Sequence, residues 1–441
     1  MGNRVSKAVE KPLSGLAYLP NDPGTPDIME EIKVPSLPTG SPEITVVGMR
    51  PGMPVGRGSA EEQAAQVYSA MVFAISTAQS ALPVPFKTWA VVGNLVAIPR
   101  AGQQLNALYD RSSLRFFHWV NRVANKVAYT CDSADVVSHE IGHAILDALR
   151  PELWNMQSLE VSAFHEAFGD CLAVLSSLQH RSVIERVIQQ TGGDLKQSNA
   201  ASRVAESLGA AIMAAGGVAS SLALRDAVNS FTYVKPEDLP ERAPVDKLSR
   251  DPHRFGLVFL GAFWDVIAAL CRHAVESGTD RADAIIHARE RAAKLLFTAV
   301  CKAKARPKFL ASVARAMVAA EEETFDGEHS ATLRRLFNAR GLICDVPFAA
   351  QFGGDGLEPV MPVEDSETIK VSVASFNQAQ AYMAAAAGCH HEEAVIDCNL
   401  AVQSAIARGL VGGYDAMFMV DGGHLVRNYI CQREVWDPNA S

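Results

Sequence analysis

The stretch DVVSHEIGHAILDALRP, from Asp135 to Pro151, contains two histidines four residues apart, His139 and His143, with Glu140 directly after the first. Residues i and i+4 of a helix share one face, so both imidazoles could bind the same metal ion. The stretch could also be an ordinary amphipathic core helix, because its valines, isoleucines and leucines form a continuous apolar face. Two imidazoles do not complete a zinc site, which needs a third protein ligand. The residues downstream therefore decide between the two interpretations.

A second helical pattern, LEVSAFHEAFGDCLAVL, follows from Leu159 to Leu175. Its two acids, Glu166 and Asp170, share a face because they are four residues apart. A carboxylate from this helix completes a set of two histidines and one acid, which leaves a fourth position for water. The other carboxylate can accept the N–H of a zinc-binding imidazole. The alternative, that both are solvated surface acids, does not explain their place on a helix rich in alanine, phenylalanine and leucine.

The composition bounds the class of protein. The chain has 441 residues, of which 48% are hydrophobic and 20% charged, and this is enough for two or three globular domains. A net charge of -9 argues against a nucleic-acid partner, which would require basic faces. No uncharged apolar run is long enough to predict a transmembrane segment. We therefore expect no nucleic acid and no integral membrane segment.

The cysteines and the N-terminus bear on the compartment. Eight scattered cysteines without a CxxC pair favour reduced thiols over a disulfide framework. No apolar signal-peptide core is visible, so we expect a cytoplasmic protein. The start MGNRVSK fits N-myristoylation at Gly2, which remains a less favoured alternative together with non-classical export.

The chain divides into four parts by composition. Residues 1–58 are rich in proline and glycine and predict a mostly irregular arm. Residues 59–134 predict one helix behind Ser59 and a small sheet, and residues 135–342 predict a lobe of long helices. Residues 343–441 combine a linker with a module of mixed helix and strand. The expected helices of the lobe are 135–149, 159–178, 200–214, 257–276, 280–303, 308–323 and 328–340.

The two helical stretches, together with three further blocks, resemble the thermolysin-like zinc metallopeptidases, the gluzincins. DVVSHEIGHA and FHEAFGD correspond to the family's zinc-binding helices. NALYD from Asn106 resembles its edge strand, and LRDAVNSFTYVKP from Leu224 and HRFGLVFLGAFW from His253 resemble two later segments. The blocks occur in the family's order over residues 95–340. The resemblance implies an α+β fold: a small N-terminal sheet region and a mostly helical lobe, to which this chain adds its C-terminal module.

The resemblance also implies a role for each matching residue. Zinc, one ion per chain, would be bound by His139, His143 and Glu166. Glu140 would be the general base that takes a proton from the attacking water. His253 would donate a hydrogen bond to the negative charge that develops on the substrate carbonyl.

Other matching residues would contact the peptide or support the ligands. Asn106 and Ala107 would bind the substrate backbone. Arg225 would bind the carbonyl of the residue after the scissile bond and pair with Asp170, which would also orient His139. Leu224 would line the pocket for that residue's side chain and so favour an apolar one.

The sequence departs from the family in three places. The aspartate that orients the catalytic histidine usually lies several residues earlier, whereas here Asp251 is only two before His253. The family's tyrosine has no clear counterpart, since Trp154 is the nearby aromatic and has no hydroxyl. Ser177 stands where secreted members have an acidic calcium ligand, so we expect no calcium even though Asp135 keeps one suitable carboxylate.

These features predict a zinc-dependent endopeptidase that acts on peptides or proteins. One alternative is a catalytically silent zinc-fold scaffold whose C-terminal module recruits an unknown protein partner. Another is an enzyme held inactive by its terminal segments. Replacing Glu140 by Gln should abolish cleavage by an enzyme, whereas the binding function of a scaffold would survive. A truncated chain that gains activity would show that the terminal segments inhibit the enzyme.

Overall fold

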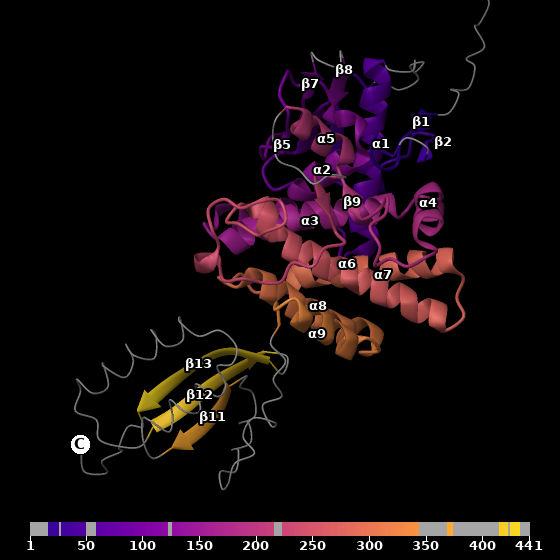
Figure 1. Cartoon of the computed structure of the whole chain (residues 1–441). Coiled ribbons are helices and arrows are strands. Elements are labelled where there is room, and N and C mark those ends of the chain that lie inside the picture. The colour runs from indigo at the N-terminus through magenta and orange to yellow at the C-terminus, as the bar shows by residue number, and fades with distance from the viewer. Residues whose placement is uncertain are drawn as a thin grey trace, which may run out of the picture. The chain divides into compact units, whose positions relative to one another are not determined.

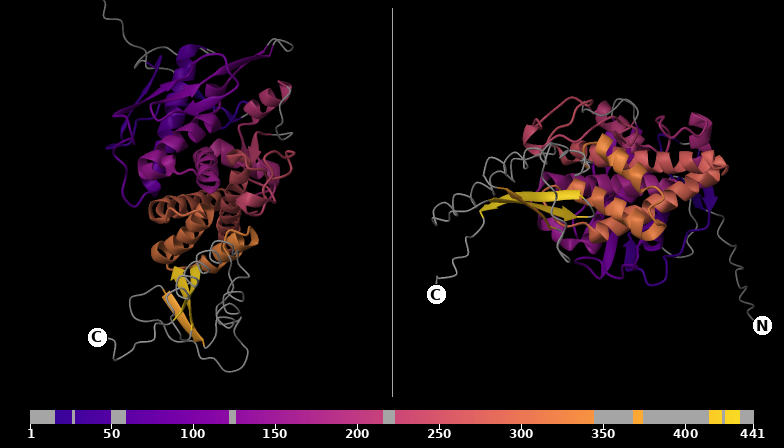
Figure 2. Two further views of the ribbon diagram at one scale, coloured as in Figure 1. Left: turned by 90° about the vertical axis from the view of Figure 1, so that its left-hand side faces the viewer. Right: turned by 90° about the horizontal axis from the view of Figure 1, so that it is seen from below.

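The computed structural model describes residues 16–25, 28–49, 59–121, 126–215 and 223–343, together with three strands nearer the C-terminus. The chain divides into two compact units, Met1–Ile343 and Cys344–Ser441. The helices are α1 (Ala60–Ala81), α2 (Ala134–Leu149), α3 (Leu159–Ser177), α4 (Arg181–Thr191), α5 (Glu206–Ala214), α6 (Pro252–Glu276), α7 (Arg281–Lys302), α8 (Phe309–Phe325) and α9 (Ser330–Ala339). In the first unit, the N-terminal strands lie toward one end and α8 and α9 at the other, with α3 and α6 between them (Figures 1 and 2).

The largest described sheet in the first unit has the strand order β3-β4-β6-β5. β3 and β4 pair in parallel, as do β4 and β6, whereas β5 pairs with β6 in the antiparallel sense, which leaves β5 at the edge. The crossover between β3 and β4 contains α1, whose N-terminus is capped by the Ser59 side chain. These strands are β3 (Glu43–Val46), β4 (Asn94–Ile98), β5 (Ala107–Tyr109) and β6 (Ser113–Phe116).

Smaller pairs of strands complete the first unit, and all three pairs are antiparallel. They are β1 (Leu16–Tyr18) with β2 (Glu30–Ile32), β7 (His118–Asn121) with β8 (Lys126–Tyr129), and β9 (Arg203–Val204) with β10 (Arg225–Asp226). Together with the helical lobe they give the expected α+β class.

The N-terminal segment contains short strands that its composition did not predict. Within residues 16–49 the structure has three short strands, and Leu16 and Tyr18 are buried in the core. Strands of three or four residues are held by backbone hydrogen bonds to a neighbour and need no alternating sequence pattern, so proline and glycine around them hide the signal. The segment is part of the folded unit.

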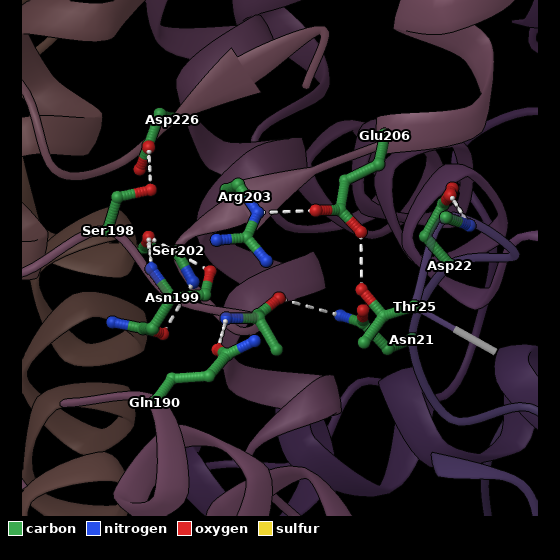
Figure 3. A network of polar contacts seen from close by, with 12 residues as sticks. Asn21, Asp22, Thr25, Gln190, Ser198, Asn199, Ser202, Arg203, Glu206 and Asp226 are labelled. Carbon is green, nitrogen blue, oxygen red and sulfur yellow. Dashed lines mark hydrogen bonds and ion pairs between the residues drawn. The ribbon is translucent and has the colours of Figure 1, made fainter. Parts of the chain in front are cut away.

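A buried polar network fastens this segment to the turn before α5 (Figure 3). The Asn21 amide donates to the Ala200 carbonyl oxygen at 3.1 Å and to Asp135 at 3.2 Å, and the Thr25 hydroxyl contacts Glu206. Asp135 also accepts the backbone N–H of Ala205 at 3.3 Å. Asp135, the carboxylate that the sequence indicates as a possible calcium ligand, is therefore engaged by donors from two other segments.

One helix was not predicted, and the starts of two others differ from the prediction. α4, which begins after His180, was not predicted, because no Ser, Thr, Asp or Asn cap marks its start. α5 begins at Glu206 rather than at residue 200, because residues 199–203 form a turn stabilised by the Asn199 side chain. α6 begins at Pro252 rather than at residue 257, since proline is well suited to the first helical position and Asp251 caps the helix.

α6 is also the one described helix that is long and apolar enough to cross a membrane by length and composition. Of its most apolar window, 89% is buried within the fold, as in the core helix of a globular protein. It packs on α3, where Phe164 and Phe259 meet edge to face with ring centroids 5.1 Å apart.

The second unit contains an antiparallel three-stranded sheet in the order β11-β12-β13. Its strands are β11 (Thr368–Val373), β12 (Tyr414–Asp421) and β13 (His424–Gln432). β11 and β12 coincide with the two strand-like stretches of the sequence, whereas β13 was not predicted. The alanine-rich helix expected between β11 and β12 lies outside the described residues.

Candidate metal centre

Two helices bring together the three side chains with the zinc-binding pattern. His139 and His143 lie one turn apart on α2, and Glu166 lies on α3. His139 Nε2 is 3.3 Å from Glu166 Oε2, and His143 Nε2 is 3.8 Å from Glu166 Oε1. One ligand atom from each of the three residues lies within 4.8 Å of the others. The donor set, two imidazole nitrogens and one carboxylate, is the set that a catalytic zinc ion uses.

Two glycines allow α2 and α3 to approach this closely. A Cβ atom on Gly142 would lie 2.9 Å from the Cα of Gly169, and a Cβ on Gly169 would lie 2.7 Å from His139 Nδ1. Both distances are below van der Waals contact, so a larger residue would push the helices apart. The small residues therefore set the distance between the histidines and Glu166.

Asp170 supports the centre from behind His139. Its Oδ1 lies 2.8 Å from His139 Nδ1, while its Oδ2 forms an ion pair with Arg225 Nε at 2.6 Å. A carboxylate on Nδ1 fixes the ring so that Nε2 faces the metal position. Arg225, on β10, is itself buried, and its Nη2 lies 3.3 Å from His139 Nδ1.

The ionised Glu166 supplies the negative charge that a cation at this centre would need. Burial alone would lower the pKa of His139, but the Asp170 carboxylate raises it to about 10, so a zinc ion binding Nε2 would displace a proton. Burial lowers the pKa of His143 to about 3, which keeps that imidazole neutral. Burial would raise the pKa of Glu166, yet His143 and His139 hold it well below its usual value, so Glu166 is ionised.

The fit of a zinc ion can be judged from one oxygen. Glu166 Oε2 is buried and accepts no hydrogen bond from the described residues, although His139 Nε2 lies 3.3 Å away and His253 Nε2 3.1 Å away. A buried ionised oxygen without a donor costs free energy unless a cation satisfies it. These residues therefore fit zinc.

Glu140 and His253 flank the ligands. Glu140 is buried, and burial raises its pKa to about 7. His253 lies in the first turn of α6, with half of its side chain exposed. Asp251 accepts the backbone N–H of His253 at 2.8 Å and also lies 3.1 Å from its Nδ1, so it orients both backbone and ring. The structure thus places an aspartate on His253 despite the short spacing.

The other residues that we expect to contact the substrate lie at β5 and beside β10. Ala107 begins β5, and Asn106 precedes it with its side chain exposed. β5 is joined to α2 by the Tyr109 hydroxyl, which donates to Asp147 at 3.0 Å. Leu224 directly precedes Arg225 and is half-buried. No hydrogen bond or ion pair joins Asn106, Ala107 or Leu224 to the three ligands in the described part of the chain.

Sequence reasoning did not single out His165, which lies beside His143 with ring centroids 5.9 Å apart. Burial lowers the pKa of His165 to about 4, and its Nε2 has no hydrogen-bond partner among the described residues. Trp154 packs edge to face on His165 and on Tyr109, and Arg111 lies over its ring. The sequence could have indicated that His165 lies near the metal centre, because it directly precedes Glu166.

The comparisons with known proteins give one family match. No curated protein matches the chain significantly. Residues 110–345, more than half of the chain, match the model of the fungalysin metallopeptidases (M36). The matched region contains both helices of the candidate metal centre, Arg225 and His253, and the chain therefore belongs to the fungalysin family of thermolysin-like zinc metallopeptidases.

Proposed function

We propose that the chain is a zinc endopeptidase whose metal is held by His139, His143 and Glu166. The observation that carries the proposal is the meeting of these three ligand atoms within 4.8 Å beside a buried glutamate and a half-exposed histidine. A lone HExxH helix would supply two of these ligands only. Bound there, zinc would polarise the peptide carbonyl and make the attacking water more acidic.

The protein's own groups would manage the proton and the charge. Glu140 would accept a proton from the water and pass it to the leaving amine. His253, whose Nδ1 is 3.1 Å from Asp251, would present its Nε2 to the carbonyl oxygen as negative charge develops there. His253 can reach a substrate because half of its side chain is exposed.

The peptide would bind as an added strand along β5. β5 is paired with β6 on one side, and as an edge strand it offers backbone groups on the other. Asn106 and Ala107 would bind the substrate backbone there. Arg225 would bind the carbonyl after the scissile bond, and Leu224 beside it would favour an apolar residue at that position.

The Glu140→Gln variant tests this proposal. We expect cleavage of an apolar-rich peptide to fall by about 10²–10⁴-fold while the zinc content measured by mass spectrometry stays the same. Glu185→Gln, on the exposed face of α4, is the matched control and should cleave like the wild type. Chelator should abolish wild-type cleavage.

Two results would contradict the proposal. Undiminished cleavage by Glu140→Gln would exclude Glu140 as the base. Zinc uptake and folding without any cleavage by the wild-type chain would favour the binding or scaffold alternative.

A further inference from the structure

A second cluster of two histidines and one carboxylate lies away from the site described above. His273 is in the last turn of α6, and Glu328 and His329 are in the turn between α8 and α9. His273 Nε2 is 3.7 Å from Glu328 Oε1, and His329 Nε2 is 3.7 Å from Glu328 Oε2. As at the first centre, one ligand atom from each residue lies within 4.8 Å of the others.

The two imidazoles of this cluster repeat the arrangement at the first centre. The rings of His273 and His329 have centroids 4.7 Å apart and planes at 79°. For His139 and His143 the corresponding values are 4.8 Å and 87°. In a tetrahedral zinc site, ligand atoms lie about 3.3 Å apart, so small side-chain movements would bring the second set into bonding range.

Neighbouring residues orient the Glu328 carboxylate by hydrogen bonds, as the residues around a metal site orient the side chains that bind the metal. Arg291 Nη1 donates to Glu328 Oε2 at 2.7 Å, which leaves Oε1 directed at His273. A hydrogen-bonded carboxylate that uses its other oxygen for the metal is the usual arrangement in metal sites. The Arg291 side chain is fixed in turn by Glu321 and by the Phe325 ring, 4.2 Å from its guanidinium carbon.

The charges around the cluster favour a cation. Glu321 is fully buried and balances the positive charge of Arg291, and it also accepts the backbone N–H of His329 at 3.0 Å. Because Glu321 balances Arg291, the cluster keeps the negative charge of Glu328 when both imidazoles are neutral. His273 and Glu328 are each more than half exposed, so an ion can reach them directly from solvent.

We propose that His273, Glu328 and His329 form a second binding site for a divalent transition-metal ion such as zinc. The site would link the end of α6 to the turn between α8 and α9, with water completing the coordination. It contains no counterpart of Glu140, so its effect would be to brace these elements rather than to cleave peptides. The fold would then hold two zinc ions, of which one serves hydrolysis.

The test is zinc uptake by the full chain in equilibrium dialysis, with the His273→Ala and Glu328→Gln variants. Both side chains are largely exposed, so both variants should fold, and melting without zinc checks this. We expect each to bind one zinc ion fewer than the wild type at saturation and to keep full peptidase activity. His287→Ala, an exposed histidine of α7 outside both clusters, should bind as many ions as the wild type.

A second measurement separates this site from the first. In the Glu166→Ala background, added zinc should still raise the melting temperature by a few degrees, and His273→Ala should remove that shift. Any zinc bound outside the described residues is common to all variants and cancels in the comparison. The proposal fails if His273→Ala and Glu328→Gln take up as much zinc as the wild type, whatever the outcome for cleavage.

Discussion

At the scale of single residues, Asp170 has two partners that depend on its charge. It faces His139 Nδ1 at 2.8 Å and forms an ion pair with the buried Arg225 at 2.6 Å. In Asp170→Asn, the amide would leave Arg225 without its countercharge and would hold the imidazole less firmly. We expect zinc affinity, measured by competition with a chelator, to fall about 10–100-fold.

The control for this variant is Asp194→Asn, an exposed carboxylate whose Oδ1 accepts the N–H of Lys196. It should leave zinc affinity unchanged. Unchanged affinity in Asp170→Asn would show that the His139 ring is fixed by packing alone.

The sequence predicts the residue pattern better than it predicts the surroundings. The spacing of His139 and His143 predicts that they share a face, because helix geometry is local. The contact between Arg225 and Asp170 joins β10 to α3, and no local pattern predicts it; here the resemblance to the family supplied it. Asp251 shows a further limit, since one carboxylate serves both as helix cap and as partner of the His253 ring.

At the scale of elements, the position of Glu166 depends on how closely α2 and α3 pack. A methyl group on Gly169 would lie 2.7 Å from His139 Nδ1 and 2.9 Å from the His139 carbonyl oxygen. We expect Gly169→Ala to lower the free energy of unfolding by about 1–3 kcal/mol, because the helices must separate, and to weaken zinc binding. Urea unfolding and zinc titration measure both effects.

Gly93→Ala is the matched control, because a Cβ atom at Gly93 would have no neighbour within 4 Å. It should change neither stability nor zinc affinity. Wild-type zinc affinity in Gly169→Ala would mean that the distance between α2 and α3 does not set the metal geometry.

Glu160, in the first turn of α3, makes the packing of the helices depend on pH. It accepts hydrogen bonds from the Tyr233 hydroxyl at 2.7 Å and from the Leu310 N–H at 3.0 Å, yet burial raises its pKa from 4.5 to about 7. The folded state therefore holds a proton that the unfolded state releases above pH 4.5. Stability is lost as pH rises from about 4.5 through 7, by about 2–3 kcal/mol between pH 5 and pH 8.

Glu160→Gln keeps the shape of the protonated acid and removes this dependence. Its free energy of unfolding relative to the wild type, measured in urea, should be about 2–3 kcal/mol more favourable at pH 8 than at pH 5. The exposed Glu152→Gln is the control and should show no such difference between the two pH values. Equal relative stability of Glu160→Gln at both pH values would contradict the expected shift.

The elements that the sequence predicted well are the long ones with a clear cap. α1 begins after Ser59 as expected, and α2, α3 and α7 lie within two residues of their predicted bounds. β1 to β3 were missed because their stability comes from partners distant in sequence: β3 pairs with β4 across α1, and β1 is buried on the core. Such pairing is a property of the assembled fold and leaves little trace in a short segment.

At the scale of the whole molecule, the match to the family and the first compact unit end at nearly the same residue. The match to the fungalysin model ends at residue 345, and the first unit ends at Ile343. Five ordered blocks spread over that unit predicted its α+β fold, because each block depends on a different part of the catalytic lobe. The C-terminal unit lies almost entirely beyond the match, so the resemblance gave no guide to β13.

Contacts of residues 340–343 hold the end of the first unit against the rest of that unit. Arg340 forms an ion pair with Asp265 at 2.8 Å and donates to the Asn229 carbonyl oxygen at 2.8 Å, while Leu342 and Ile343 are buried. A chain that ends after Ile343 keeps all these contacts, so we expect it to melt as a cooperative unit and to bind zinc at the catalytic centre. A chain that ends after Ala339 loses two buried apolar side chains and the Arg340 contacts, at a cost of about 4–8 kcal/mol.

Calorimetry of the two truncated chains measures this difference, with the full chain as reference. Equal melting temperatures would show that residues 340–343 contribute little, contrary to their burial. Peptidase assays on the same samples test whether the C-terminal unit regulates activity, because the chain ending after Ile343 retains both helices of the candidate metal centre and His253. If its activity per bound zinc exceeds that of the full chain, the C-terminal unit inhibits the enzyme; equal activity would assign that unit a role outside control of the catalytic site.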